Sequence, residues 1–130
     1  MSAVLWTDLY ELTVAACRRF GLVEPILEPM TRRRRCKMDG DCVRGPGRTP
    51  VVRLRLHRYH RPRQALARST IMATLAHELA HLAAGCWNHG RAHDAMAQAI
   101  AAWLREQGQP VSSRIKQGSH PDTNRKKRRN

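Results

Sequence analysis

The residues best placed to do chemistry are the five of His77-Glu78-Leu79-Ala80-His81. A helix advances about 100° per residue, so His77 and His81 lie one turn apart on the same face. Both imidazoles can then reach one metal ion at roughly 2.0–2.1 Å. Glu78 is offset by one residue and points beside the ion, where its carboxylate can accept a proton from water. The motif predicts a zinc site with His77 and His81 as ligands and Glu78 as the general base.

A third ligand is needed, because catalytic zinc sites usually combine three protein ligands with one open position. The downstream candidates are His89, His93, Asp94 and Glu106. The metzincin spacing needs Gly three residues and His six residues after His81, and Ala84 and Trp87 at those positions exclude it. Glu106 falls near the end of the last predicted helix. Gly85 is expected to end the motif helix, so His89 in the following turn can fold back over the motif.

The stretch from about residue 50 to residue 105 resembles the SprT-like and WLM-type metallopeptidases. Their pattern is HExxH, a short variable loop, and then HGxxF at the opening of a helix. The matching residues are His77–His81 and Asn88-His89-Gly90. The resemblance implies zinc ligands at His77, His81 and His89, a general base at Glu78, and a role on proteins that are bound to DNA.

His93 stands where the family has its aromatic residue after the glycine. We favour a part-buried histidine that packs in the position of that aromatic ring. Two alternatives remain open: His93 could replace His89 as third ligand, or donate a hydrogen bond to the transition-state oxyanion. If His89 and His93 both bound zinc, the open position would be closed and the zinc would be structural.

The predicted elements follow the order helix, short sheet, helix, helix. Residues 4–20 have apolar side chains at helical spacing, and Gly21 follows as a helix stop. The motif helix could open at Pro62 and runs to Gly85, and a last helix covers roughly residues 90–107.

Between the helices, the sequence indicates a small antiparallel sheet. Pro25 and Pro29 predict a loop, whereas residues 31–37 and 42–44 flank Asp39-Gly40, a favoured hairpin turn. Val51–Leu56 alternates apolar and basic side chains, as a half-buried strand does. The expected fold class is α+β and minimal zincin-like. Residues 1–108 form one domain, and residues 109–130 form a basic tail without an apolar pattern, predicted to be disordered.

The net charge of +14 is concentrated in two segments. Residues 31–68 carry thirteen basic and two acidic side chains, net +11, and residues 108–130 carry seven and one, net +6. Such a field favours polyanions. We expect non-specific contacts with DNA or RNA through the following groups: Arg32, Arg33, Arg34, Arg35, Arg53, Arg55 and the basic tail. Charge retained for solubility is the simpler alternative.

The chain has four cysteines, at Cys17, Cys36, Cys42 and Cys86. No signal peptide and no membrane span can be drawn, so we expect a cytoplasmic protein with reduced thiols. Cys36 and Cys42 are either two unpaired thiols or, with His57 and His60, part of a second zinc site.

The sequence thus favours a zinc metalloendopeptidase that acts on proteins associated with nucleic acid. One alternative is a basic nucleic-acid-binding protein with a structural zinc site. The other is a metal-dependent hydrolase that acts on bonds other than peptide bonds.

Overall fold

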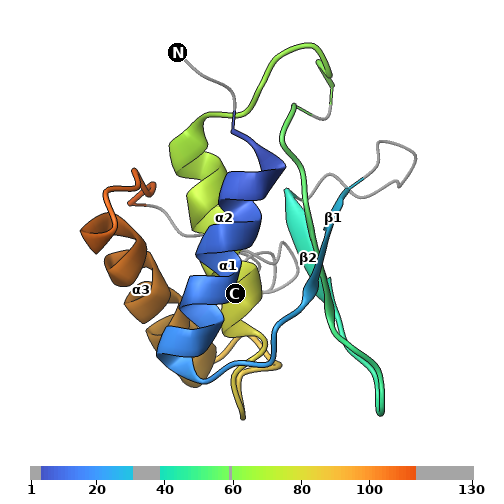
Figure 1. The fold of residues 1–130 in the computed structure, drawn as a ribbon, viewed down its shortest axis with the longest axis vertical. Helices are drawn as coiled ribbons and strands as arrows, with labels where there is room; N and C mark the ends of the chain where they lie inside the picture. The colour runs from blue at the N-terminus through green and yellow to red at the C-terminus, as the bar shows by residue number, and fades with distance from the viewer. Residues whose placement is uncertain (1–3, 31–38, 59, 114–130) are drawn as a thin grey trace, which may run out of the picture.

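The computed structural model describes residues 4–30, 39–58 and 60–113. The elements follow in the order α1 (Trp6–Phe20), β1 (Ile26–Pro29), β2 (Gly40–Val43), β3 (Val51–Leu54), α2 (Arg68–Ala80) and α3 (Arg91–Glu106). The fold is α+β, with an N-terminal helix, a small sheet and two further helices, as predicted (Figure 1). Among the described residues, no helix has the length and apolarity that a membrane span requires.

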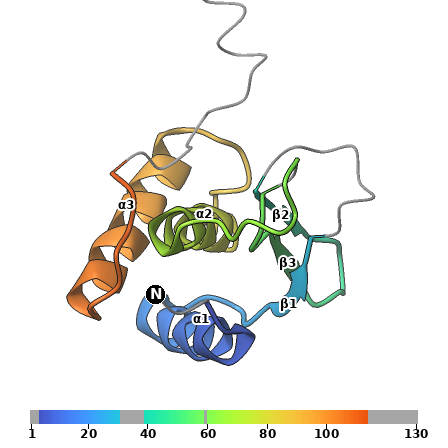
Figure 2. The same cartoon turned by 90° about the horizontal axis from the view of Figure 1, so that it is seen from above.

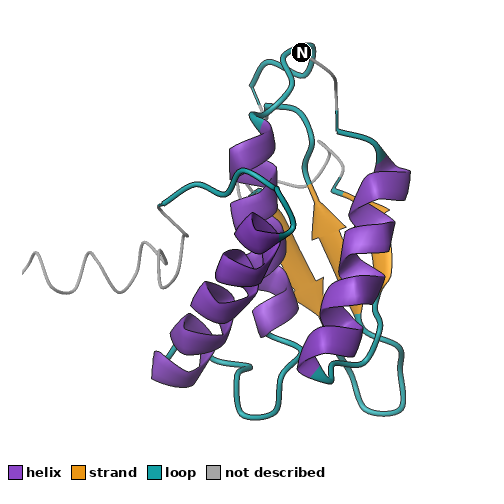
Figure 3. Cartoon of the chain, turned by 60° about the vertical axis from the view of Figure 1, so that its left-hand side comes forward, coloured by secondary structure: helices purple, strands orange, loops and turns teal. Residues whose placement is uncertain are grey.

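Helix α2, which carries the motif, is the central element. Viewed from above, it lies between α3 and the strands, with α1 beside it (Figure 2). Its side chains are buried around most of its circumference, including those of Ile71, Met72, Leu75, Ala76 and Leu79. A helix that is apolar on all sides belongs in a core. The three helices lie on one face of the sheet (Figure 3), so the motif is carried by the most enclosed element of the fold.

The sheet has the strand order β1-β3-β2. β2 is antiparallel to β3, but β1 is parallel to it, so the sheet is mixed and the prediction of an antiparallel sheet is wrong in this detail. β1 also occupies the segment between Pro25 and Pro29 that was predicted to be a loop. Proline is compatible with a strand at the edge of a sheet, where its missing N–H costs no ladder bond.

The predicted hairpin turn at Asp39-Gly40 is also wrong. Gly40 begins β2 and pairs with Leu54 of β3, and the chain reverses over residues 44–50 instead. The predicted first arm, residues 31–37, lies outside the described residues.

Gly40 is required by close packing rather than by a turn. A Cβ atom at this position would lie 2.7 Å from Cγ2 of Thr74 and 2.8 Å from the carbonyl oxygen of Arg53. Real Cβ contacts of this length essentially never occur. The absent side chain therefore allows β2 to approach α2 closely.

Helix α2 is shorter than predicted at both ends. It begins at Arg68 rather than Pro62, because the preceding chain stays paired: Arg58 N–H bonds to the Gln64 carbonyl (2.9 Å) and Leu66 N–H to the Leu56 carbonyl (2.8 Å). It ends at Ala80, and the chain then tightens into turns before Gly85, which has a φ of 77°.

The described chain continues past α3 and contacts the start of α2. Arg68 Nε donates to Gln109 Oε1 at 2.9 Å, and the Ser112 N–H donates to the Ser69 carbonyl at 3.1 Å. Most of the predicted basic tail, residues 114–130, lies outside the described residues.

Candidate metal centre

Three imidazoles converge at the C-terminal end of α2. Nε2 of His89 lies 3.1 Å from Nε2 of His77 and 3.0 Å from Nε2 of His81. Tetrahedral zinc with ligands at 2.0–2.1 Å separates its ligand nitrogens by roughly 3.3 Å. With His93 included, one ring nitrogen of each of the four histidines lies within 4.8 Å of the others. These histidines could hold a metal ion, and they include all three predicted ligands.

The tautomer of His81 fits a cation at this point. Its Nδ1 lies 3.1 Å from the carbonyl oxygen of Cys86, which can only accept, so Nδ1 carries the proton. The lone pair of His81 Nε2 then faces His89 Nε2. Lone pairs that face one another repel unless a cation or a shared proton lies between them. The carbonyl also fixes the orientation of the ring, as outer partners of metal ligands commonly do.

A short loop carries His89 back over α2. Gly85 adopts a left-handed conformation (φ 77°), which glycine reaches without a Cβ penalty. Cys86, within this loop, is buried, and its N–H bonds to the Ala83 carbonyl at 3.1 Å. Gly90 then forms the N-cap of α3, so His89 lies directly before that helix, in the place that the sequence predicted.

Glu78 is only 6% exposed, and electrostatic interactions link its carboxyl to Asp41 and Cys42 of β2. Burial raises the pKa of its carboxyl to about 8, and the nearby carboxylate of Asp41 adds to this. Burial also raises the pKa of the Cys42 thiol to about 12, with the charge of Glu78 as the next cause, so this thiol lies near the carboxyl. A cation within about 4–6 Å would favour the ionised form of Glu78.

His93 is fully buried rather than part-buried. Its Nε2 lies 2.9 Å from the carbonyl oxygen of His77, and its ring centroid is 4.2 Å from that of His81. The ring therefore packs inside the domain, but one of its nitrogens is engaged by the backbone of the motif.

Arg44 and Trp87 lie beside His81. Nη1 of Arg44 donates to the carbonyl oxygen of His81 at 2.8 Å, and its guanidinium lies 5.3 Å from the centroid of the Trp87 ring. Trp87 is 49% exposed, and its ring centroid is 5.7 Å from that of His81. No sequence pattern singled out Arg44, because its contact joins residues 37 apart.

The remaining ligand candidates are not brought into the cluster. Asp94 Oδ1 lies 3.8 Å from Nδ1 of His93, and Glu106 is exposed at the last residue of α3. In the described ranges, the four histidines are the one group of three or more potential ligands that could hold a metal ion. Cys42 is a free thiol there, and Cys36 lies outside those ranges.

The arginines of the predicted basic face of β3 are paired or buried within the domain. Arg53 makes a bidentate ion pair with Asp41 (2.8 and 2.9 Å), and Arg55 is only 5% exposed. The other predicted contacts, Arg32–Arg35 and most of the tail, lie outside the described residues.

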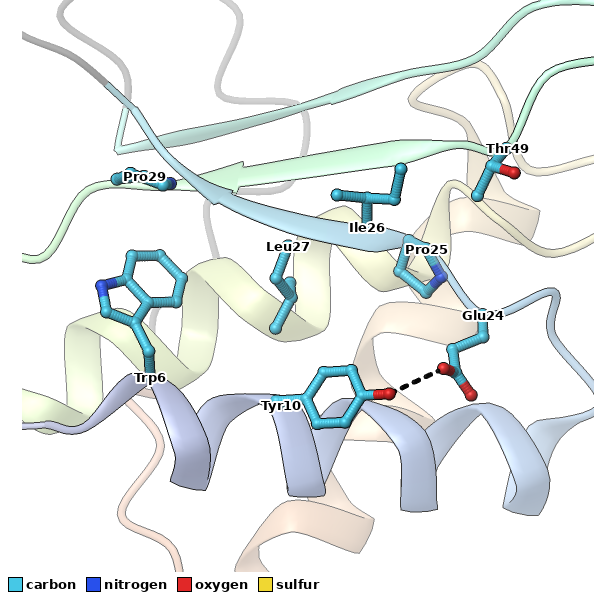
Figure 4. A pocket seen from close by; sticks show the side chains of 8 residues that line it. All are labelled: Trp6, Tyr10, Glu24, Pro25, Ile26, Leu27, Pro29 and Thr49. Atoms are coloured by element: carbon cyan, nitrogen blue, oxygen red, sulfur yellow. Dashed lines mark hydrogen bonds between the residues drawn. The ribbon is translucent and has the colours of Figure 1, made fainter.

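A cavity of about 660 Å³ lies between α1 and β1, away from the histidines (Figure 4). Its walls include Trp6, Leu27 and the Tyr10 ring, whose hydroxyl donates to Glu24 Oε1 at 3.2 Å. No histidine or cysteine lines it, so it is separate from the metal centre.

Comparison with protein-family models, curated proteins and solved structures finds no match for this chain. The function is therefore inferred from the geometry of the centre and from the chemistry of its residues.

Proposed function

We propose that the protein is a zinc-dependent metallopeptidase of SprT-like type. The convergence of three imidazole nitrogens at the motif that contains Glu78 carries this proposal. Three neutral imidazoles suit zinc, and a three-ligand set leaves a position open for chemistry. His77, His81 and His89 would hold the ion.

Bound zinc would supply Lewis acidity, which lowers the pKa of water to about 7 and polarises a carbonyl group. Glu78 accepts the proton of the attacking water and passes it to the leaving amine. Cys86 holds His81 in the tautomer that ligation needs, through its carbonyl oxygen. The burial of Glu78 strengthens its electrostatic interactions with neighbouring charges.

The edge of β2 supports a peptide as the substrate. The Arg55 N–H donates a hydrogen bond to the Asp39 carbonyl oxygen (2.8 Å), so Asp39 and Arg55 are a hydrogen-bonded pair of the β2–β3 ladder. Hydrogen-bonded and non-hydrogen-bonded pairs alternate along such a ladder. Accordingly, the backbone groups of Asp41 face β3, and those of Gly40 and Cys42 face away. An extended peptide can add to such an edge through main-chain hydrogen bonds. It would then pass beside Cys42, whose thiol lies near Glu78.

The decisive experiment compares the zinc-loaded full chain with a Glu78→Gln variant on a fluorogenic peptide library. We expect hydrolysis by the wild type and a loss of about 10²–10⁴-fold in the variant. The variant should still bind one zinc per chain. Glu106→Gln, at the exposed end of α3, is the matched control and should leave the rate unchanged. Equal rates for the wild type and Glu78→Gln would overturn the proposal.

A structural zinc site bound by four histidines is the second candidate, because His93 belongs to the same cluster. Four protein ligands would close the open position. In that case, zinc removal would lower stability, but no peptide would be cleaved by the zinc-loaded wild type.

We further propose that basic charge brings the peptidase to proteins on nucleic acid, in a reducing, cytoplasmic setting. The net charge of +14 supports such a partner, and Cys17, Cys42 and Cys86 are free thiols. Fluorescence anisotropy with a DNA duplex should show binding that weakens steeply between low and high salt. It should also weaken when Arg32–Arg35 are replaced by glutamine. Binding that is insensitive to salt would exclude this partner.

A further inference from the structure

The backbone of the metal-binding motif is held by two side chains from other elements. On α3, Nε2 of His93 lies 2.9 Å from the carbonyl oxygen of His77. Arg44, which follows β2, donates a hydrogen bond to the carbonyl oxygen of His81 at 2.8 Å. Each motif histidine thus has its carbonyl oxygen engaged by a side chain. α3 and the strands lie on opposite sides of α2, so the two contacts reach the motif from opposite directions (Figure 2).

These contacts occur at the C-terminal end of α2, where the backbone has the fewest hydrogen bonds within the helix. The last carbonyl groups of a helix lack intrahelical donors. Here the helix ends at Ala80, and the N–H of His81 bonds to the carbonyl of Glu78 at 3.2 Å, a tightened turn. Cationic and N–H-donating side chains stabilise carbonyls at this end of a helix. The direction of each imidazole depends on this backbone, because Cβ is fixed by it.

The protonation of the His93 ring distinguishes a residue that holds the motif backbone from one that binds the metal ion. A carbonyl oxygen can only accept, so Nε2 of His93 carries a proton. That nitrogen is not available to a metal ion. Nδ1 has no hydrogen-bond partner among the described residues, and Asp94 Oδ1 lies 3.8 Å away, beyond hydrogen-bonding distance.

We propose that His93 and Arg44 are positioning residues, which fix the carbonyl oxygens of His77 and His81 so that both imidazoles present Nε2 toward His89. This inference rests on the proposed metal centre but not on peptide hydrolysis. His93 is then neither the fourth ligand nor merely a ring that fills space, and the fourth position of the metal stays open.

Two substitutions at His93 separate the three roles. Glutamine can place an amide N–H where Nε2 lies, whereas phenylalanine fills the ring volume without a donor. For a positioning residue, His93→Gln keeps zinc affinity within about threefold of wild type, and His93→Phe weakens it by about 10–100-fold. Zinc affinity is measured by competition with a chromophoric chelator. The thermal midpoint of each metal-free protein is measured in parallel.

Two other patterns would overturn the proposal. A fourth ligand predicts that both variants lose affinity and that cobalt-loaded protein changes its visible spectrum in both. A space-filling ring predicts that His93→Phe matches wild type and that His93→Gln loses stability and affinity together. His89→Ala serves as the ligand control, and Gln98→Ala, at an exposed position of α3, serves as the neutral control.

Two measurements do not depend on how the His93 variants fold. In wild-type protein loaded with ¹¹³Cd, imidazole nitrogens of three histidines should couple to the metal, and coupling to His93 would overturn the inference. Arg44 is exposed, and Arg44→Lys should retain more zinc affinity than Arg44→Met. If both variants bind zinc as tightly as the wild type, Arg44 is not a positioning residue. A wild type that binds zinc through three histidines but cleaves no peptide would refute the proposed function and leave this inference standing.

Discussion

The two outer edges of the sheet differ in their free backbone donors. In β1, the N–H groups of Ile26 and Met30 bond toward β3, at 2.9 Å each. The alternate residues therefore face away from β3, and they are Pro25, Leu27 and Pro29. Two of these three have no N–H to offer. Proline at such positions protects an edge against added strands.

Within the described parts of the chain, the edge of β2 has no such protection. Its outward-facing residues, Gly40 and Cys42, both retain an N–H. The protected edge borders the cavity between α1 and β1 (Figure 4), whereas the unprotected edge lies beside Glu78 and the segment that contacts His81. Among the described residues, the sheet is therefore protected against strand addition at the edge away from the histidines, and it keeps free N–H groups at the edge beside them.

Closing the β2 edge should have the largest effect, measured as the rate of peptide hydrolysis. Cys42→Pro removes an outward N–H but no bond to β3, so the fold is retained while a peptide loses main-chain contacts. One lost hydrogen bond at about 1–1.5 kcal/mol corresponds to roughly 5–13-fold in kcat/KM. The rate is measured with the best peptide substrate.

Two controls complete this test. Cys42→Ala removes the thiol but keeps the N–H, and should retain activity. Val43→Pro places the missing N–H toward β3 and should unfold the sheet edge, with a lower thermal midpoint. If Cys42→Pro cleaves peptides as fast as Cys42→Ala, the β2 edge does not bind substrate.

Separating β2 from α2 should have the next largest effect. In Gly40→Ala, the new Cβ meets Thr74 and the Arg53 carbonyl, and we expect a stability loss of about 1–3 kcal/mol in urea unfolding. Gly45→Ala, where the nearest atom would be 3.6 Å away, should change little. Equal stability of the two variants would contradict the close approach of β2 to α2.

Opening the β1 edge should have a smaller effect. Pro29→Val restores an outward N–H, and we expect weak self-association, seen as a sedimentation coefficient that rises with concentration. Pro46→Val, in the exposed loop between β2 and β3, removes a proline without changing an edge and should remain unaffected. Identical sedimentation of both variants would show that the prolines do not protect β1.

The smallest expected effect is a pH dependence at Cys17, on α1 behind the β1 edge. Burial raises the pKa of this thiol from 9.0 to about 11, and the carboxylate of Glu24 adds to the shift. The folded state therefore favours the neutral thiol, and this stabilisation is complete below pH 9 and is lost as the pH rises through 11. The urea midpoint should fall more steeply over this range in wild type than in Cys17→Ala. Parallel slopes would contradict the assignment.

Helices and motif residues were predictable because their signals are local. The spacing within His77–His81 requires only helical geometry, and Gly85 and His89 mark the turn that follows. For the same reason the α+β class was confirmed, and α1 and α3 begin and end within two residues of their predicted limits.

Contacts between distant segments were not predictable. The dipeptide Asp39-Gly40 is typical of a turn, yet Gly40 allows β2 to pack closely against Thr74 of α2. This role is visible only in the assembled fold. β1 has four residues ending in Pro29, too few for an alternating pattern. The contacts of Arg44 and His93 with the motif join residues 37 and 16 apart, and depend on how three elements pack.

The short loop between α2 and α3 also has a consequence for folding. All four clustered histidines lie between residues 77 and 93, within one helix–loop–helix unit. Closing a short loop costs little chain entropy, and contacts of low sequence separation form early. The four histidines can therefore come together from their own local stretch of chain, and the contact of Arg44 with the motif forms later, when the sheet packs against α2.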